Sequence, residues 1–276
     1  MSKTILITGT SSGIGKTAAK HFASKGWNVI ATMRSPEKED ELTRLENILL
    51  TSLDVQKPET IASAIEKGIE KFGKIDVLVN NAGYGEFGLF EASSPEQVHE
   101  QFDINVFGVM NTIRAILPHF RERKEGMIIN ISSGAGKFTL PLISLYSASK
   151  FALEGFSEAL SFELSALNIG VKIIEPGGTQ TNFSNVSFEK FGEKLHLEDY
   201  DGFLTASGKL FSSLSGMQLA TAEEVADVIF EAVTDGTDTL RYVVGNDDFK
   251  KRMAARATMS DQDYVNSVRN SYLKFM

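Results

Sequence analysis

Short β-branched runs alternate with longer amphipathic stretches along the chain, and this alternation restricts the folds open to it. The strand-like runs cover 4–7, 28–32, 48–53, 77–79, 127–131, 171–175 and 242–244, and the helix-like stretches cover about 13–24, 39–45, 58–72, 95–120, 146–167 and 222–233. Short, mostly apolar strands separated by helices are typical of a parallel sheet covered on both faces. Because crossovers are right-handed, we expect an α/β fold with a doubly wound parallel sheet, a Rossmann fold.

Length and composition exclude several classes of protein. A chain of 276 residues commonly forms one α/β domain, so we expect a single domain over 1–276. The formal net charge of −8 argues against binding to nucleic acid. Without cysteine, and with four histidines that lack metal-ligand spacing, no metal site is expected. No apolar run approaches the roughly 20 residues that span a bilayer, and a strand-like run at the very start leaves no room for a leader, so we expect the cytoplasm.

Two segments depart from the alternation. The stretch 184–220 interrupts it between the sixth strand and the last helix of the sheet, and long insertions of this kind often close over a ligand. We expect a helical substrate lid there. The segment 248–276 extends past the last strand and is expected to cover the site or to reach a neighbouring subunit.

The first strand leads into a helix through Thr8-Gly9-Thr10-Ser11-Ser12-Gly13-Ile14-Gly15. Gly9 permits a tight turn, Gly13 lets the backbone approach a pyrophosphate, and Gly15 lets the helix lie close to the sheet. The helix N-terminus adds N–H groups and the positive end of its dipole. Glycine turns are common in loops, but this one lies inside the first βαβ unit, where a dinucleotide binds.

This turn resembles the cofactor turn of the short-chain dehydrogenase/reductase family in its compact form. Asn80-Asn81-Ala82-Gly83 and Pro176-Gly177-Gly178-Thr179-Gln180-Thr181 resemble two further elements of that family, although Thr179 replaces the commoner valine. The nearest branch is that of the retinol and 17-beta-hydroxysteroid dehydrogenases. The resemblance implies a nicotinamide dinucleotide held by Gly9, Ser11, Ser12, Gly13, Ile14, Gly15, Arg34, Asp54, Val55, Asn81, Ala82, Gly83, Tyr146, Lys150, Pro176, Gly177, Thr179 and Thr181. For Asp54, a helix cap before Pro58 is an equally good interpretation.

The end of the second strand indicates which dinucleotide binds. Members of the family that prefer NAD generally place an acid where Met33 falls, and here Arg34 follows instead. A guanidinium pairs with a 2′-phosphate through two parallel hydrogen bonds. The alternative is an exposed arginine at a strand end. We therefore expect NADP(H) as the cofactor.

Tyr146 and Lys150 are four residues apart, so in a helix they share one face. The lysine charge, joined by the positive charge of an oxidised nicotinamide, is expected to lower the pKa of the phenol, which then acts as general acid and base. The spacing alone is unspecific. Ser133, after the fifth strand, matches the substrate-orienting serine of the family, with Ser132 as a rival, and Asn105 matches the asparagine that holds a water beside the lysine.

These residues predict an NADP(H)-dependent oxidoreductase that interconverts a hydrophobic ketone or aldehyde and its alcohol by hydride transfer. The alternatives are a non-catalytic NADP(H)-sensing regulator and a sugar-nucleotide epimerase. The resemblance implies a homodimer or homotetramer assembled through the helices that contain Asn105 and Tyr146. The stretches 84–91, 134–145 and 184–220 are expected to border the substrate, although more than half of their apolar side chains are expected to be ordinary packing between lid and body. These side chains are Phe87, Leu89, Phe90, Phe138, Leu140, Leu142, Phe183, Phe188, Phe191, Phe203, Leu204, Leu210, Phe211 and Met217.

Overall fold

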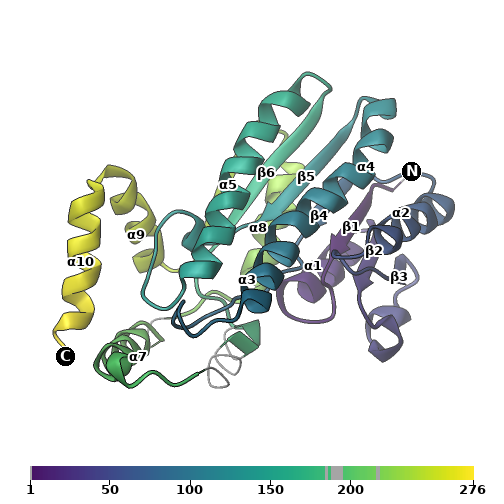
Figure 1. Ribbon diagram of the computed structural model, residues 1–276. Helices are drawn as coiled ribbons and strands as arrows, with labels where there is room; N and C mark the ends of the chain where they lie inside the picture. The colour runs from purple at the N-terminus through teal and green to yellow at the C-terminus, as the bar shows by residue number, and fades with distance from the viewer. Residues whose placement is uncertain (1, 184–185, 188–194, 216–217) are drawn as a thin grey trace.

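Seven parallel strands form one sheet in the computed structural model (Figure 1), which describes residues 2–183, 186–187, 195–215 and 218–276. The strands are β1 (Thr4–Thr8), β2 (Asn28–Met33), β3 (Ile48–Ser52), β4 (Val77–Asn80), β5 (Gly126–Ile131), β6 (Ile169–Pro176) and β7 (Arg241–Val244). Their order across the sheet is β3-β2-β1-β4-β5-β6-β7. Strand order reverses between β1 and β4, so the predicted doubly wound fold is confirmed.

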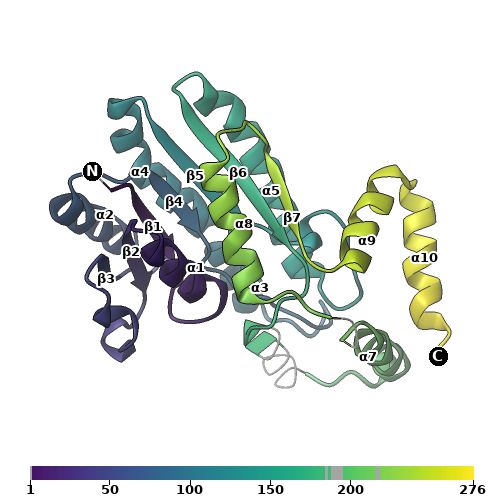
Figure 2. The same ribbon diagram turned by 180° about the vertical axis from the view of Figure 1, so that it is seen from behind.

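Helices cover both faces of the sheet, as Figures 1 and 2 show. They are α1 (Gly13–Ser24), α2 (Pro58–Phe72), α3 (Pro95–Phe102), α4 (Val109–Arg123), α5 (Ser144–Ser165), α7 (Asp201–Ser215), α8 (Ala222–Thr234), α9 (Asp247–Thr258) and α10 (Asp261–Leu273). Ile5 and Ile7 of β1 are buried against α1 and α8, and Leu6 between them is buried in the cluster with α2, α4 and α5. Alternate side chains of one strand thus enter two cores. Each fully buried side chain contributes about 1.5–3 kcal/mol to the stability of the fold.

The prediction of a helix over 39–45 is wrong. Two short 3₁₀ turns, η1 (Pro36–Lys38) and η2 (Leu42–Arg44), stand in its place. The Glu39 carboxylate accepts the backbone N–H groups of Glu41 at 2.8 Å and Leu42 at 3.0 Å. A side chain that takes over backbone donors in this way competes with continuous helical hydrogen bonding.

The single helix predicted over 95–120 is interrupted. After α3 the chain makes a π-helical turn, η3 (Asp103–Gly108), and only then continues as α4 to Arg123. A π-turn widens the backbone locally and is frequently found at functional sites. It contains Asn105, whose side chain is almost fully buried. The interruption therefore falls on a residue that the sequence singled out.

The described part of the segment 184–220 contains a short 3₁₀ turn, η5 (Glu198–Tyr200), and helix α7. Phe188, Phe191 and Met217, expected near the substrate, lie outside the described residues. The segment beyond β7 folds into α9 and α10, and α10 lies beside α7 in both views (Figures 1 and 2). Among the helices described, none combines the length and the apolar character that crossing a bilayer requires.

Candidate active site

The glycine turn between β1 and α1 has the close contacts that its residues predict. Gly9 has a φ of +72°, and a Cβ added there would lie 2.9 Å from the Ala82 backbone. A Cβ on Gly15 would overlap the Gly9 carbonyl and the Asn81 amide. No acidic side chain lies in the first turn of α1, whose N-cap residue is Ser12. The turn thus presents backbone N–H groups and a positive dipole end without a competing carboxylate, as an anion site requires.

Asn81 holds this turn to the end of β4. Its amide donates to the carbonyl oxygens of Thr8 at 2.9 Å and Gly9 at 3.0 Å. The Thr8 hydroxyl in turn accepts the backbone N–H groups of Asn81 and Ala82, each at 3.0 Å. The loop that contains Gly83 is therefore locked against the glycine turn. This satisfies otherwise unpaired backbone groups at the carboxyl ends of β1 and β4.

Three predicted contacts lie toward the adenosine end of such a site. Arg34 is exposed immediately after β2 and, within the described part of the chain, forms no ion pair. Asp54 accepts the backbone N–H of Gln56 at 3.1 Å, which makes an Asx turn rather than the cap of α2, since the N-cap residue there is Lys57. Val55 is buried in the core below η3.

The loop after β6 closes the other side of the glycine turn. The Gly177 backbone N–H donates to Val244 O at 2.8 Å, and Thr179 forms an isolated bridge with Ala220. The methyl group of Thr181 would lie 3.2 Å from a Cβ on Gly13. The loop starting at Pro176 and the glycine turn are thus neighbours.

Ser133, Tyr146 and Lys150 meet at the carboxyl end of β5. Tyr146 and Lys150 lie on one face of α5, and the Lys150 ammonium is 5.8 Å from the centre of the tyrosine ring. The ammonium donates to Ile131 O at 2.8 Å. The Ser133 hydroxyl lies close enough to the phenol to lower its pKa, whereas the Ser132 hydroxyl is buried without a hydrogen-bond partner in the described part of the chain. The geometry therefore brings together three of the four predicted catalytic residues.

Burial controls the protonation of this group. It raises the pKa of Tyr146 to about 12, and the nearby Ser133 hydroxyl acts in the opposite direction. Burial lowers the pKa of Lys150 to about 8, and the negative charge of Glu154 opposes that change. The lowered tyrosine pKa expected from the sequence is therefore not found in this arrangement, because burial disfavours the phenolate more than Ser133 favours it.

Asn105 lies behind the pair rather than in contact with its reactive atoms. Its amide group donates to Tyr84 O at 2.8 Å and to the Ser149 hydroxyl at 3.2 Å, and its oxygen accepts the Tyr84 N–H at 3.0 Å. Ser149 precedes Lys150 on α5. Asn105 thus joins the loop after β4 to the helix that carries Tyr146 and Lys150, and its role in holding a water stays a prediction.

Aromatic side chains surround the Tyr146 ring. The ring centres of Phe87 and Phe183 lie 5.7 Å and 5.5 Å from it. Ala135, Leu140, Ile143 and Phe211 complete this cluster. Other predicted pocket residues lie elsewhere: Phe90 is 65% exposed, and Phe203 contacts Tyr272 of α10. The surroundings of the phenol are apolar.

A buried carboxyl pair, Glu154 on α5 and Glu175 on β6, lies next to Lys150 and was not predicted. Arg241 Nε donates to Glu154 at 2.9 Å and lies 3.4 Å from Glu175. Burial, together with the charge of Glu154, raises the pKa of Glu175 to about 7, against the charges of Lys137 and Arg241. The position of Glu154 four residues after Lys150 was visible in the sequence, but the approach of β6 was not.

The carboxyl pair predicts a pH-dependent stability. The pKa of Glu175 is higher in the folded than in the unfolded protein. Its contribution to the free energy of unfolding is therefore complete below about pH 4.5 and is lost as the pH rises through about 7. Glu175→Gln stays neutral and keeps a donor for Glu154. At pH 8 we expect this variant to melt a few degrees above the parent, which corresponds to about 1–2 kcal/mol in the free energy of unfolding. At pH 5 the two melting temperatures should differ little.

Glu158→Gln is the matched control for this melting experiment. Glu158 is exposed, and its carboxylate accepts a hydrogen bond from the Arg241 guanidinium at 2.6 Å. This bond lowers the pKa of Glu158. Its contribution is therefore present at pH 8 and lost in acid, so the control variant should melt slightly lower at pH 8. A Glu175→Gln difference from the parent that is the same at pH 5 and pH 8 would contradict the assignment.

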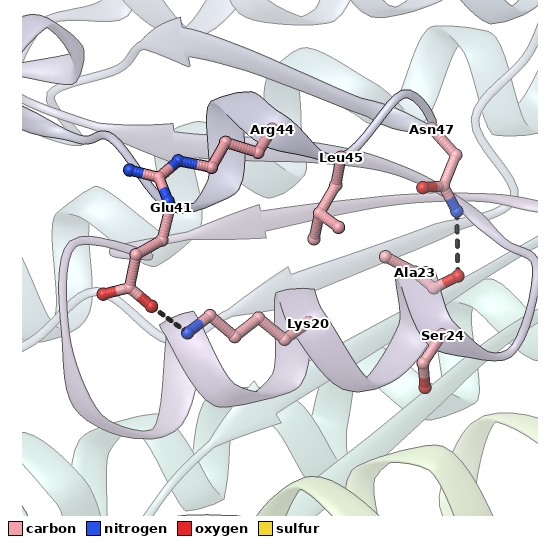
Figure 3. Close-up of a pocket in the computed structure, with 7 residues that line it drawn as sticks. All are labelled: Lys20, Ala23, Ser24, Glu41, Arg44, Leu45 and Asn47. Carbon is pink, nitrogen blue, oxygen red and sulfur yellow. Dashed lines mark hydrogen bonds and ion pairs between the residues drawn. The ribbon is translucent and has the colours of Figure 1, made fainter.

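A surface hollow lies away from all these residues. It is bordered by α1, η2 and the turn before β3 (Figure 3). Asn47 donates to Ala23 O there at 2.9 Å, and Lys20 pairs with Glu41. It contains none of the predicted site residues. The candidate site is therefore the carboxyl edge of the sheet.

Comparison with known proteins identifies the family of this chain. The family profile described as "short chain dehydrogenase" matches residues 3–191. An uncharacterized oxidoreductase of Schizosaccharomyces pombe is 43% identical over 235 residues, covering 84% of this chain and 96% of that protein. Retinol dehydrogenase 8 of Homo sapiens is 36% identical over 245 residues, covering 82% and 78%.

Two solved structures are similar over most of the chain. A short-chain dehydrogenase from Streptomyces avermitilis superposes with a TM-score of 0.80 at 30% identity, covering all of this chain and 97% of the other. ElxO with NADP bound has a TM-score of 0.72 at 29% identity, covering 88% and 98%.

Proposed function

This chain belongs to the short-chain dehydrogenase/reductase family of oxidoreductases, and on that premise we propose that it interconverts a hydrophobic ketone or aldehyde and its alcohol using NADP(H). The observation that carries the proposal is the meeting of Ser133, Tyr146 and Lys150 at the carboxyl edge of the sheet. In open α/β sheets this edge, at the reversal of strand order, is where ligands bind.

The residues present suit a phosphorylated dinucleotide. A Cβ on Gly9 would meet the Ala82 backbone and one on Gly15 would overlap the Gly9 carbonyl, so the compact turn that offers its N–H groups to a pyrophosphate requires glycine at both positions. Arg34 has a free guanidinium among the described residues, and no acid occupies the position of Met33. These two features support NADP(H) over NAD(H). Thr181, beside Gly13, would hold the carboxamide end.

When bound, the nicotinamide supplies or accepts the hydride, and its oxidised form adds a positive charge beside the phenol. The chain supplies the proton. With a pKa of about 12, Tyr146 is protonated at neutral pH and donates its phenolic proton to the carbonyl oxygen during reduction. Ser133 donates a hydrogen bond to the same oxygen, and the charge of Lys150 stabilises the phenolate left on Tyr146.

The substrate class follows from what surrounds the reacting phenol. Phe87 and Phe183 flank Tyr146, and Leu140, Ile143 and Phe211 are packed around them. An apolar lining with few polar groups favours an apolar carbonyl compound over a sugar or an acid. The similarity to retinol dehydrogenase 8, a protein named for an alcohol substrate, also supports this class.

Loss of NADPH absorbance with a panel of aromatic ketones, aldehydes and steroids tests the proposal. We expect turnover with the apolar members and none with sugars or sugar nucleotides. Binding of NADPH without turnover across the panel would favour the regulator. Conversion of a sugar nucleotide without net NADPH loss would favour the epimerase.

We also propose that the chain is a homo-oligomer, as its relatives imply. Phe107 on η3 and Phe151 and Phe162 on α5 are 53%, 43% and 73% exposed, on the two helices expected at the interface. Apolar side chains of this size gather where subunits meet. A monomeric mass in sedimentation equilibrium would contradict this proposal.

A further inference from the structure

The C-terminal segment, α9 and α10, turns back onto the carboxyl edge of the sheet (Figure 2). Asn246 fixes its first turn: the side-chain oxygen accepts the Phe249 N–H at 2.8 Å, and the amide donates to Gln218 O at 2.5 Å. Phe249 is therefore anchored to the end of β7 at one side and to the residues before α8 at the other. Its ring points to the loops that follow β5 and β6.

Three glycines make room for the Phe249 ring. A Cβ on Gly177 would lie 2.8 Å from the ring, a Cβ on Gly245 would lie 2.5 Å from it, and one on Gly134 would overlap it. None of the three has a positive φ. Their backbone conformations are open to any residue, so here the phenylalanine ring, and not backbone strain, requires glycine. Gly134 follows Ser133 directly, and Gly177 follows Pro176.

The same segment holds the Ser133 loop at two more points. The Phe138 ring centre lies 6.0 Å from that of Phe249, and the Arg252 guanidinium stands 5.7 Å above the Phe138 ring. The hydroxyl of Tyr264 donates to Thr139 O at 2.6 Å, and the Tyr264 side chain is buried. α9 and α10 are therefore part of the site wall rather than a free tail.

We propose that Phe249 is a positioning residue whose ring sets the separation between the loop that carries Ser133 and the loop that starts at Pro176. This inference rests on the proposed function, in which the first loop orients the substrate oxygen and the second holds the nicotinamide end. Hydride transfer depends on sub-ångström placement of the two partners, and small misplacements cost large factors in rate. Removing the ring lets both loops relax into the space it occupied.

A pair of substitutions tests the contact itself. For Gly177→Ala the three nearest atoms to the new methyl all belong to Phe249, so the loop or the ring must move. We expect Gly177→Ala to weaken NADPH binding about tenfold or more, and Gly177→Ala combined with Phe249→Ala to restore it to within about threefold of the parent. Calorimetric titration with NADPH measures both. A double variant as weak as Gly177→Ala would overturn the proposal.

Turnover separates positioning from simple stability. Phe249→Ala alone should leave the NADPH dissociation constant within about threefold of the parent while kcat falls about tenfold or more. Phe249→Leu, which keeps an apolar side chain, replaces the alanine variant in this test if that variant does not fold. Its kcat should lie between those of the parent and Phe249→Ala. The matched control is Leu45→Ala, at a partly exposed apolar side chain next to η2 and away from the site, with kcat within about twofold of the parent. A kcat for both Phe249 variants equal to that of the control would overturn the proposal.

The two proposals fail in different ways. If the parent protein binds NADPH but turns over no member of the panel, the proposed function is wrong. The binding cycle between Gly177 and Phe249 still decides the present inference in that case, because it needs no substrate.

Discussion

Tyr146→Phe is expected to reduce kcat about 10³-fold or more with any substrate of the wild-type protein, because it removes the only atom that can pass a proton to the carbonyl oxygen in the proposed mechanism. General acid catalysis typically contributes about 10²–10⁴ in rate. The phenylalanine ring keeps the contacts with Phe87 and Phe183, so the fold should be retained. The NADPH dissociation constant should stay within about threefold of the parent. Steady-state kinetics and calorimetry measure the two effects separately.

Tyr242→Phe is the matched control, because it removes one phenolic hydroxyl far from Ser133. The Tyr242 hydroxyl contacts Lys172 at 2.9 Å and Asp235 at 2.5 Å. Its loss should lower the melting temperature with little change in kcat. If Tyr146→Phe kept a kcat within about threefold of the parent, the tyrosine would not be the proton donor, and the mechanism would be wrong.

Arg34→Glu is expected to shift the preference for NADPH over NADH by about 10²–10³-fold. The substitution removes charge-assisted hydrogen bonds to a 2′-phosphate, worth about 1.5–3 kcal/mol, and places a negative charge beside it. It also places an acid next to the Met33 position, where members that prefer NAD carry the acid that accepts hydrogen bonds from a ribose 2′-hydroxyl. The ratio of kcat/KM values for the two cofactors, with one substrate, measures the shift.

Arg44→Glu makes the same charge change in the same region. Its side chain is 75% exposed and pairs with Asp40, an exposed contact of little energetic value. The cofactor ratio should stay within about threefold of the parent for this control. If Arg34→Glu behaved like Arg44→Glu, the arginine would be an exposed side chain at a strand end, and the choice of NADP(H) would lose its support.

The strands and the glycine turn were predictable because their signals are local. A β-branched run of a few residues is buried on both faces of a parallel sheet whatever else the chain does. The turn from Gly9 to Gly15 combines a strand end, a positive φ and a helix start within one short segment. Where a side chain competes with the backbone, as Glu39 does, the periodic pattern predicted a helix that the chain does not form.

The sequence by itself predicted the doubly wound sheet and the shared helix face of Tyr146 and Lys150, and the family resemblance added Ser133. It did not predict the 3₁₀ turns that replace one helix or the π-turn that interrupts another. Only the tertiary structure decided the energetics of the candidate site. The pKa of Tyr146 rises because folding buries it, and the acid pair beside Lys150 exists because β6 brings Glu175 to α5. Phe249 reaches Gly134 and Gly177 from more than 70 residues further along the chain. Contacts between segments so distant in sequence depend on the packed chain, which no local pattern contains.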